Sequence, residues 1–541
     1  MANWWKNAVG YQIYPRSFMD SNDDGIGDLK GIQAKIPYLK ELGIDFIWLN
    51  PIYQSPNVDN GYDISDYQAI NPEFGTLEDL KELIQLAHDN QIKLIMDLVI
   101  NHTSDQHPWF LESKKSKENP YRDYYLWADA SPEKMPNNWQ SFFGGSTWTY
   151  DSSTKQAYFH VFAKEQPDLN WKNPAMRKDI YQMIRWWLDF GIDGFRLDAI
   201  SHIQKQPWDF KITDNPWAPF MNVAGIETYM AELKEIFRSY NIMTVGEASG
   251  VSSKSAALWT DPEDGYIDMI FELEHQVRTG EPGYEIGSLS GFKKVLSRWQ
   301  KDLQPNGWNA LYIDNHDNPR SNSIFGNETN ESATALATAY LLLRGTPFIY
   351  QGQELGMTNF PFESIDELRT TESLQTYHDW LNKGLSQNEA LRLTTHWTRD
   401  HSRTPMHWTE LGGFSTNQPW MKLNTNTDRI NVAIQQANPA SPFNYYKKLI
   451  TLRKSLPVFT SGSYQIALAK HPSVWAYTRK DETNEVFVLT NLSEKEQTVT
   501  LPNYWTNPND SFEVLLTNYP NTTWQKKLIL RPYEAIVVKK H

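Results

Sequence analysis

The chain has 541 residues, with 65 acidic and 51 basic side chains and a formal net charge of −14. This length exceeds one compact core of ordinary size, so two or three domains are expected. The acidic balance argues against nucleic acid as a partner, and a neutral small ligand fits better. No stretch reaches the ~18 apolar residues of a membrane helix, no signal peptide is recognisable, and Cys is absent, so we expect a cytoplasmic protein without a membrane partner, either monomer or homodimer.

The first two thirds of the sequence alternate between short apolar runs and amphipathic stretches. The apolar runs predict eight strands, over Ala8–Tyr14, Phe46–Ile52, Lys93–Ile100, Gly194–Ile200, Met243–Ser249, Met269–His275, Ala310–Asp317 and Pro347–Glu354. Apolar residues three and four apart predict intervening helices, over Leu29–Leu42, Leu77–Asn90, Met176–Phe190, Ile226–Tyr240, Leu289–Leu303, Ala333–Arg344 and Tyr445–Lys454. This alternation predicts an α/β fold, a (β/α)8 TIM barrel whose chemistry lies at the carboxyl ends of the strands.

Two connections are too long to be simple loops. One follows the third strand and predicts a small inserted domain, and the other, over residues 358–441 after the eighth strand, should overhang the active face. The final segment consists of short alternating runs between turns, which predicts an antiparallel β-domain of the sandwich type. The predicted domains are the barrel over 1–102 and 171–459, the inserted domain over 103–170 and the C-terminal β-domain over 460–541.

Polar residues stand at the ends of four predicted strands: Asp97 and His102, Arg196 and Asp198, Glu247, and Asn315 to Asp317. Arg196 and Asp198 are two residues apart and face the same side, so the arginine should keep Asp198 ionised and lower its pKa, as a nucleophile requires. Glu247 has small and apolar neighbours, and partial desolvation suits a carboxylic acid that donates protons near neutrality. Retaining glycoside hydrolysis needs two carboxyls ~5 to 5.5 Å apart. A single strand-end carboxylate more often caps a helix or binds an arginine, so the prediction depends on their joint occurrence in order.

These segments resemble a known family. Asp97–His102, Gly194–Asp198, Glu247 and Asn315–Asp317 are similar, in order, to the signature regions of glycoside hydrolase family 13, the α-amylase superfamily. Gln166–Trp171 resembles its additional region in the protruding domain. The opening Trp4-Trp5 and Tyr11–Phe18 resemble the α-glucosidase and oligo-1,6-glucosidase group.

The resemblance implies that Asp198 is the nucleophile, Glu247 the acid/base, and Asp317 the carboxylate that holds sugar hydroxyls. It also implies that Asp59 and Arg399 grip the non-reducing glucose in a closed pocket, which makes the enzyme exo-acting. A salt bridge between those two residues is the structural alternative. The full implied set for substrate is Asp59, Tyr62 beneath the sugar ring, His102, Phe162, Gln166, Arg196, Ala199, His316 and Arg399.

Linkage preference depends on Ala199, which follows the nucleophile. In the group that the chain resembles, Val there accompanies α-1,6 preference, whereas Ala accompanies activity on α-1,4 bonds, because a β-branched wall crowds the leaving sugar. We therefore expect maltose, short maltooligosaccharides and sucrose as substrates, with transglucosylation left open. Ala199 packing a barrel layer is the alternative. An oligo-1,6-glucosidase, a trehalose-6-phosphate hydrolase and a sucrose isomerase also remain open, and Gln353 departs from the acidic residue more frequent at its position.

A metal site is predicted near the N-terminus. Oxygen-bearing residues alternate there with a glycine available for the turn, as calcium loops require. The run resembles the calcium loop of the same group, which implies Asp20, Asn22, Asp24, Asp28 and the carbonyl of Ile26 as ligands. An Asx turn before the following helix is the alternative. Calcium would be structural, and no organic cofactor is expected.

Overall fold

The structure is a computed structural model and describes residues 3–276, 289–304 and 306–541. Eight parallel strands close into a barrel in the order β1, β2, β5, β9, β10, β11, β12 and β13, with β13 paired to β1. Their bounds are β1 Gly10–Ile13, β2 Phe46–Leu49, β5 Lys93–Val99, β9 Gly194–Asp198, β10 Met243–Glu247, β11 Met269–Phe271, β12 Asn309–Leu311 and β13 Thr346–Tyr350. The predicted TIM barrel is confirmed.

The sixth and seventh strands are shorter than predicted. The seventh was expected to run to Asp317, but β12 ends at Leu311. Beyond it, Asp314 Oδ1 accepts a hydrogen bond from the Ser321 amide at 2.6 Å, and Asn315 Oδ1 accepts one from the Asp317 amide at 2.9 Å. These side chains bind backbone groups locally and compete with the strand ladder. His316 and Asp317 therefore lie on a loop above the barrel.

The helices follow the predicted pattern with one division. The predicted helix over Leu29–Leu42 is split at Lys35 into α1 (Leu29–Ala34) and α2 (Ile36–Leu42), because Pro37 has no amide hydrogen to continue the helix. The other predicted helices appear as α3 Leu77–Asp89, α5 Pro174–Phe190, α6 Ile226–Arg238, α8 Leu289–Leu303, α10 Asn330–Leu341 and α14 Pro442–Ser455. A short helix that was not predicted, α7, spans Ala256–Thr260.

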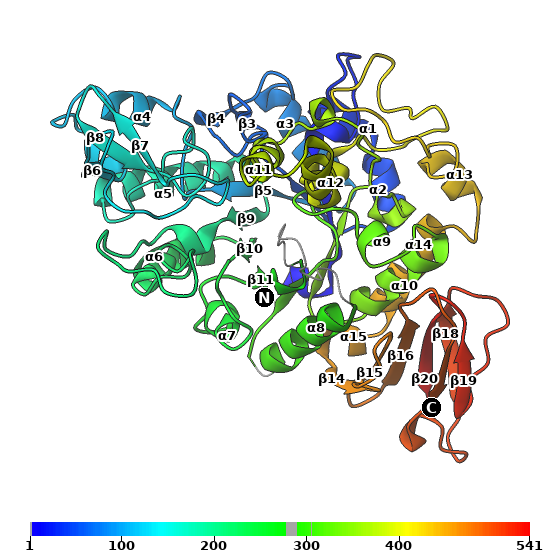
Figure 1. The fold of residues 1–541 in the computed structure, drawn as a ribbon. Coiled ribbons are helices and arrows are strands. Elements are labelled where there is room, and N and C mark those ends of the chain that lie inside the picture. The colour runs from blue at the N-terminus through cyan, green and yellow to red at the C-terminus, as the bar shows by residue number, and fades with distance from the viewer. Residues whose placement is uncertain (1–2, 277–288, 305) are drawn as a thin grey trace.

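Both long connections contain regular structure. After β5 come α4 (Pro108–Ser113) and a three-stranded antiparallel sheet, which protrudes beside the barrel in Figure 1. The strands of this sheet are β6 Trp127–Asp129, β7 Trp148–Asp151 and β8 Gln156–Phe159, with β8 in the centre. After β13, α11 (Thr371–Asn382) and α12 (Gln387–Trp397) pack together through Tyr377 and Trp380. The loop after β2 holds the short pair β3 Tyr53–Gln54 and β4 Asp66–Ile70.

The C-terminal segment forms two antiparallel sheets around one apolar cluster, at the lower right of Figure 1. The larger sheet has the order β14 Ser463–Ala467, β15 Val474–Lys480, β16 Glu485–Asn491, β20 Ala535–Lys540 and β18 Phe512–Thr517, and the smaller pairs β17 Gln497–Thr500 with β19 Lys527–Leu530. Phe487 stacks on Trp505 in this cluster. The predicted antiparallel β-domain is confirmed. Within the described residues, no helix is both long enough and apolar enough to cross a membrane.

Candidate active site

One buried arginine joins three carboxylates at the carboxyl ends of neighbouring strands. Arg196 Nη1 lies 2.5 Å from Asp97 Oδ1 and 2.5 Å from Asp198 Oδ1, and its Nη2 lies 2.7 Å from Glu247 Oε2. Strands β5, β9 and β10 are adjacent, which places these side chains together. Because the two terminal nitrogens of one guanidinium each hold a different carboxylate, Asp198 and Glu247 are immediate neighbours.

The contacts leave one oxygen on each carboxyl for chemistry. Glu247 Oε2 accepts from Arg196 and, at 3.2 Å, from the Ala199 amide, so a proton on Glu247 belongs on Oε1. Asp198 Oδ1 faces Arg196, and among the described residues no donor contacts Asp198 Oδ2. This arrangement can place a nucleophilic oxygen beside a reacting carbon and a proton donor beside the oxygen that leaves that carbon.

The electrostatic prediction for Asp198 is wrong in direction. Burial raises the pKa of Asp198 well above its ordinary value, and the nearby Arg196 opposes this shift without overcoming it. The physical reason is that Arg196 is shared with Glu247 and Asp97, whose negative charges also raise the pKa of Asp198. Burial likewise raises the pKa of Asp97 to about 6.

A hydrogen-bond network orients Tyr62 and His316. Gln12 Nε2 donates to Asn50 Oδ1 and to His316 Nδ1, both at 2.8 Å, so the His316 proton lies on Nε2. This Nε2 lies 2.7 Å from the Tyr62 hydroxyl, and the two rings are stacked with centroids 5.4 Å apart. Burial lowers the pKa of His316 well below its ordinary value, so the imidazole is neutral. The network fixes the Tyr62 ring predicted to support the sugar.

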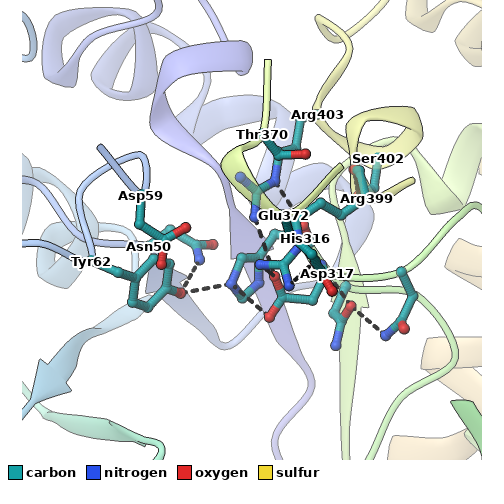
Figure 2. Close-up of polar contacts among 12 residues, drawn as sticks. Asn50, Asp59, Tyr62, His316, Asp317, Thr370, Glu372, Arg399, Ser402 and Arg403 are labelled. Atoms are coloured by element: carbon teal, nitrogen blue, oxygen red, sulfur yellow. Dashed lines mark hydrogen bonds and ion pairs between the residues drawn. The ribbon is translucent and has the colours of Figure 1, made fainter. Parts of the chain in front are cut away.

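Two arginines converge on Asp317 (Figure 2). Arg399 Nη1 lies 2.8 Å and Arg403 Nη2 lies 3.2 Å from Asp317 Oδ1. Both arginines belong to a 3-10 helix, η8 (Arg399–Arg403), in the connection after β13. Arg399 also forms an ion pair with Glu372 on α11. The connection after β13, the last barrel strand, thus holds Asp317, which lies in the loop after β12.

Asp59 is buried, and no arginine among the described residues forms an ion pair with it. It accepts a hydrogen bond from Gln166 Nε2 at 3.1 Å, and burial raises its pKa to about 7 although Arg399 and Arg403 lower it. The alternative of a salt bridge between Asp59 and Arg399 is not what the structure shows, since Arg399 is paired with Asp317 and Glu372.

A second chain of contacts fixes His102. The buried Lys205 Nζ lies 2.6 Å from Asp168 Oδ2 and donates to Asn101 Oδ1 at 2.9 Å. The Asn101 amide nitrogen therefore faces His102 Nδ1, at 3.2 Å, and His102 Nε2 lies 3.1 Å from both the Tyr62 carbonyl oxygen and Gln166 Nε2. Burial lowers the pKa of His102 to about 4, so the ring is neutral.

These groups surround a cavity of about 410 Å³, a size typical of small-molecule sites. Nine predicted residues line it: Asp59, Tyr62, His102, Phe162, Asp198, Ala199, Glu247, Asp317 and Arg399. Gln166, Arg196 and His316 do not line the cavity. They form hydrogen bonds with residues that do, which are Asp59, Asp198 and Tyr62 respectively. Sequence reasoning missed other lining residues, among them Phe142, Phe143, Trp217 and Glu372, because they come from connections between barrel strands that carry no recognisable motif. Gln353 is buried away from the cavity and donates to the Tyr340 and Tyr446 hydroxyls.

Ala199 lies at the cavity wall in a left-handed conformation, with φ 45° and ψ 32°. A β-branched residue is strained in this left-handed region of backbone conformation, whereas Ala is strained less. The conformation turns the chain sharply after Asp198 and aims the Ala199 amide at Glu247.

The predicted calcium loop is closed by its own side chains. Asp20 accepts from the Asn22, Asp23 and Gly25 amides, and Asp28 accepts from Ser21 and from Gly31 as the N-cap of α1. Within the part of the chain that the structure describes, no three His, Asp or Glu side chains are grouped as a metal site. These contacts account for the loop as Asx turns, and calcium binding stays a prediction.

A TIM barrel whose strand ends bring paired carboxylates to one cavity has the arrangement that glycoside hydrolases require. Residues 12–462 match the family described as alpha amylase, catalytic domain, and residues 474–537 match the alpha-amylase SusG C-terminal domain. The chain belongs to the α-amylase family, glycoside hydrolase family 13.

Relatives that match over the whole length are named for different activities. An oligo-1,6-glucosidase of Parageobacillus thermoglucosidasius is 46% identical, with 99% of each chain covered. An alpha-glucosidase of Pediococcus pentosaceus is 43% identical, with 99% of this chain and 98% of the relative covered. The crystal structure of a trehalose-6-phosphate hydrolase of Bacillus licheniformis superposes with a TM-score of 0.95 at 40% identity, covering 99% of each chain.

Proposed function

We propose that this enzyme is an exo-acting, retaining α-glucosidase that releases glucose from the non-reducing end of short α-glucosides. The observation that carries the proposal is the pairing of Asp198 and Glu247 on the two terminal nitrogens of Arg196. Neighbouring carboxyls leave no space for the intervening water of an inverting reaction, so the retaining course is favoured.

In this mechanism Asp198 Oδ2 attacks the anomeric carbon of the terminal glucose. The glycosidic C–O bond breaks, and Glu247 transfers its Oε1 proton to the departing oxygen. Glu247 then takes a proton from water, and the resulting hydroxide displaces Asp198 from the anomeric carbon with net retention. Asp317, held by Arg399 and Arg403, would accept hydrogen bonds from sugar hydroxyls and favour the distorted transition state.

The exo-action is supported by charged groups around the terminal sugar. Asp59 and Arg399 both line the cavity and can bind terminal hydroxyls. A chain continuing past that sugar would have to displace the Arg399 ion pairs with Asp317 and Glu372. Removing one partner of a buried ion pair is costly, so short substrates that end at this point are preferred.

The small side chain of Ala199 favours α-1,4 bonds, with maltose, short maltooligosaccharides and sucrose as substrates and transglucosylation as a side reaction. The second candidate is an oligo-1,6-glucosidase, which is favoured by the oligo-1,6-glucosidase that is 46% identical to this chain over 556 residues. The proposal includes a structural calcium ion held by Asp20, Asn22, Asp24, Asp28 and the Ile26 carbonyl. It also includes a cytoplasmic location and a monomeric or homodimeric state. The calcium ion, the location and the oligomeric state have no role in the proposed chemistry.

The test is a time course with maltose, isomaltose, sucrose and trehalose-6-phosphate, with products identified and the released anomer followed by NMR. The glucose cleaved from the non-reducing end should appear first as the α-anomer, in excess over the anomer mixture that the reducing-end glucose of maltose already carries, and Asp198→Asn should abolish its release. An initial excess of β-glucose over that mixture would contradict retention, and full turnover by the variant would remove Asp198 as nucleophile. Faster hydrolysis of isomaltose than of maltose would select the second candidate.

A further inference from the structure

A second cavity lies at the opposite end of the barrel from the catalytic carboxylates. It has a volume of about 280 Å³. Its lining includes Asp268 and Trp308, which immediately precede strands β11 and β12, and Thr244 near the start of β10. In a TIM barrel the reaction takes place at the carboxyl ends of the strands, so this cavity at their amino ends is separate from the proposed reaction.

Basic side chains dominate the lining of this amino-end cavity. Lys6 comes from the 3-10 helix η1 (Trp4–Asn7), Lys234 and Arg238 come from α6, and Arg344 follows α10. The acidic members are Asp261 and Asp268. Both acidic groups are engaged locally, because Asp261 accepts from the Glu263 and Asp264 amides and Asp268 accepts from the Thr244 amide and hydroxyl.

None of these four cations has a carboxylate partner within the described residues, and Lys234 and Arg238 donate to the carbonyl oxygens of Glu263 and Asp264. The Lys6 ammonium makes no hydrogen bond or ion pair there and lies 5.2 Å from the centre of the Trp308 ring. The Arg344 guanidinium lies 4.8 Å from the same ring centre and donates to the carbonyl oxygens of Leu303 and Gly307. A partly buried cation without an anion is electrostatically unfavourable.

The pKa shifts of Lys6 and Arg344 agree with positive charge that is not fully neutralised. Burial lowers the pKa of Arg344, and burial together with the nearby Arg344 lowers the pKa of Lys6, although Asp268 opposes the latter shift. Burial also raises the pKa of Asp268 to about 6, so this carboxylate is mostly ionised at neutral pH and offsets one part of the positive charge of the four cations. An added anion would relieve the repulsion between Lys6 and Arg344.

We propose that this amino-end cavity binds a small phosphorylated compound, whose phosphate is neutralised by Lys6 and Arg344. Phosphate suits the site because it carries up to two negative charges and because an arginine fork binds its oxygens well. The indole rings of Trp5 and Trp308 provide apolar walls for an attached sugar carbon skeleton. This ligand is distinct from a phosphorylated substrate, since the catalytic cavity is at the other end of the barrel.

Binding is measured on the full-length enzyme by calorimetry and by the thermal midpoint. Inorganic phosphate and glucose 6-phosphate are the probes, with glucose and sodium chloride of equal ionic strength as references. Both phosphates should raise the midpoint beyond the salt reference, and glucose should not, because a ligand that binds only the folded state stabilises it. Tighter binding of glucose 6-phosphate would identify an ester as the ligand, and equal binding would identify free phosphate.

Lys6→Gln is the decisive variant, and Lys81→Gln is its control, since Lys81 is an exposed lysine on α3. Lys6→Gln should weaken phosphate binding about tenfold, the change expected from losing one charge-assisted contact, while Lys81→Gln leaves it unchanged. Hydrolysis of maltose by both variants verifies the fold. Phosphate binding that matches sodium chloride, or that survives Lys6→Gln unchanged, would overturn the proposal.

Discussion

Replacing Arg196 by Met should separate the electrostatic role of the guanidinium from its packing. The variant leaves Asp97, Asp198 and Glu247 buried together without their shared cation. Breaking a buried ion pair by removing one partner costs about 3–5 kcal/mol, so the free energy of unfolding at neutral pH should fall by that order. The pKa of Asp198, already raised by burial, should rise further, because Arg196 is the group that lowers it.

The sign of the pH effect follows from the nucleophile acting only when ionised. A higher pKa moves the acid limb of kcat/KM to higher pH, so Arg196→Met should lose most activity at neutral pH and recover part of it on the alkaline side. The assay is the pH profile of kcat/KM on maltose, together with chemical denaturation.

Arg453→Met is a matched control for Arg196→Met. Arg453 is equally buried but donates only to the carbonyl oxygens of Leu341, Leu343 and Gly345. It should lower stability without moving the acid limb. An Arg196→Met enzyme whose acid limb coincides with that of the wild type would refute the electrostatic reasoning.

Four further predictions test individual parts of the site. Ala199→Val should raise the ratio of the isomaltose rate to the maltose rate. It should also lower the free energy of unfolding by about 1–2 kcal/mol, because a β-branched residue is strained at φ 45°. Ala199→Gly should keep the wild-type rate ratio, and an unchanged ratio in the Val variant would contradict the linkage argument. Lys205→Met should raise KM for maltose more than it lowers kcat, because it frees the amide that orients His102, whereas Lys205→Arg restores KM; equal losses in both constants would indicate a structural role alone. Burial raises the pKa of Asp59 to about 7, and in the proposed function its ionised form accepts hydrogen bonds from sugar hydroxyls. KM should therefore rise as the pH falls through that value, and Asp59→Asn should abolish this pH dependence. Chelation of calcium should lower the thermal midpoint of the wild type but not of Asp20→Asn, and a wild-type midpoint indifferent to chelator favours the Asx turn.

The barrel could be predicted from the sequence because its strands are buried on both faces. Runs such as Phe46–Leu49 are apolar throughout and stand between amphipathic helices, a pattern specific to parallel sheets. The end of the seventh strand could not be predicted. Whether Asp314 and Asn315 continue a ladder or bind local amides depends on the loop around them, which no periodicity encodes.

The candidate site divides in the same way. Asp198 and Glu247 end regular strands, so their positions follow from the barrel. Glu372 and Trp217 reach the cavity from connections whose paths are set by tertiary contacts, and no local signal marks them. The direction of the Asp198 pKa shift was also beyond local reasoning, because it depends on how deeply the fold buries this carboxyl and on how many carboxylates share Arg196.

The division of labour within the fold explains how specificity can vary while the chemistry stays constant. The paired carboxylates belong to barrel strands, whereas Asp59, Arg399 and Glu372 come from the connections after β2 and β13. Changes in those connections can reshape the grip on the sugar without moving Asp198 against Glu247. Relatives of 40–46% identity that are named for different activities are consistent with this separation. Substitution of the carboxylates therefore tests the proposed reaction, whereas substitution in the connections or at Ala199 tests the proposed linkage preference.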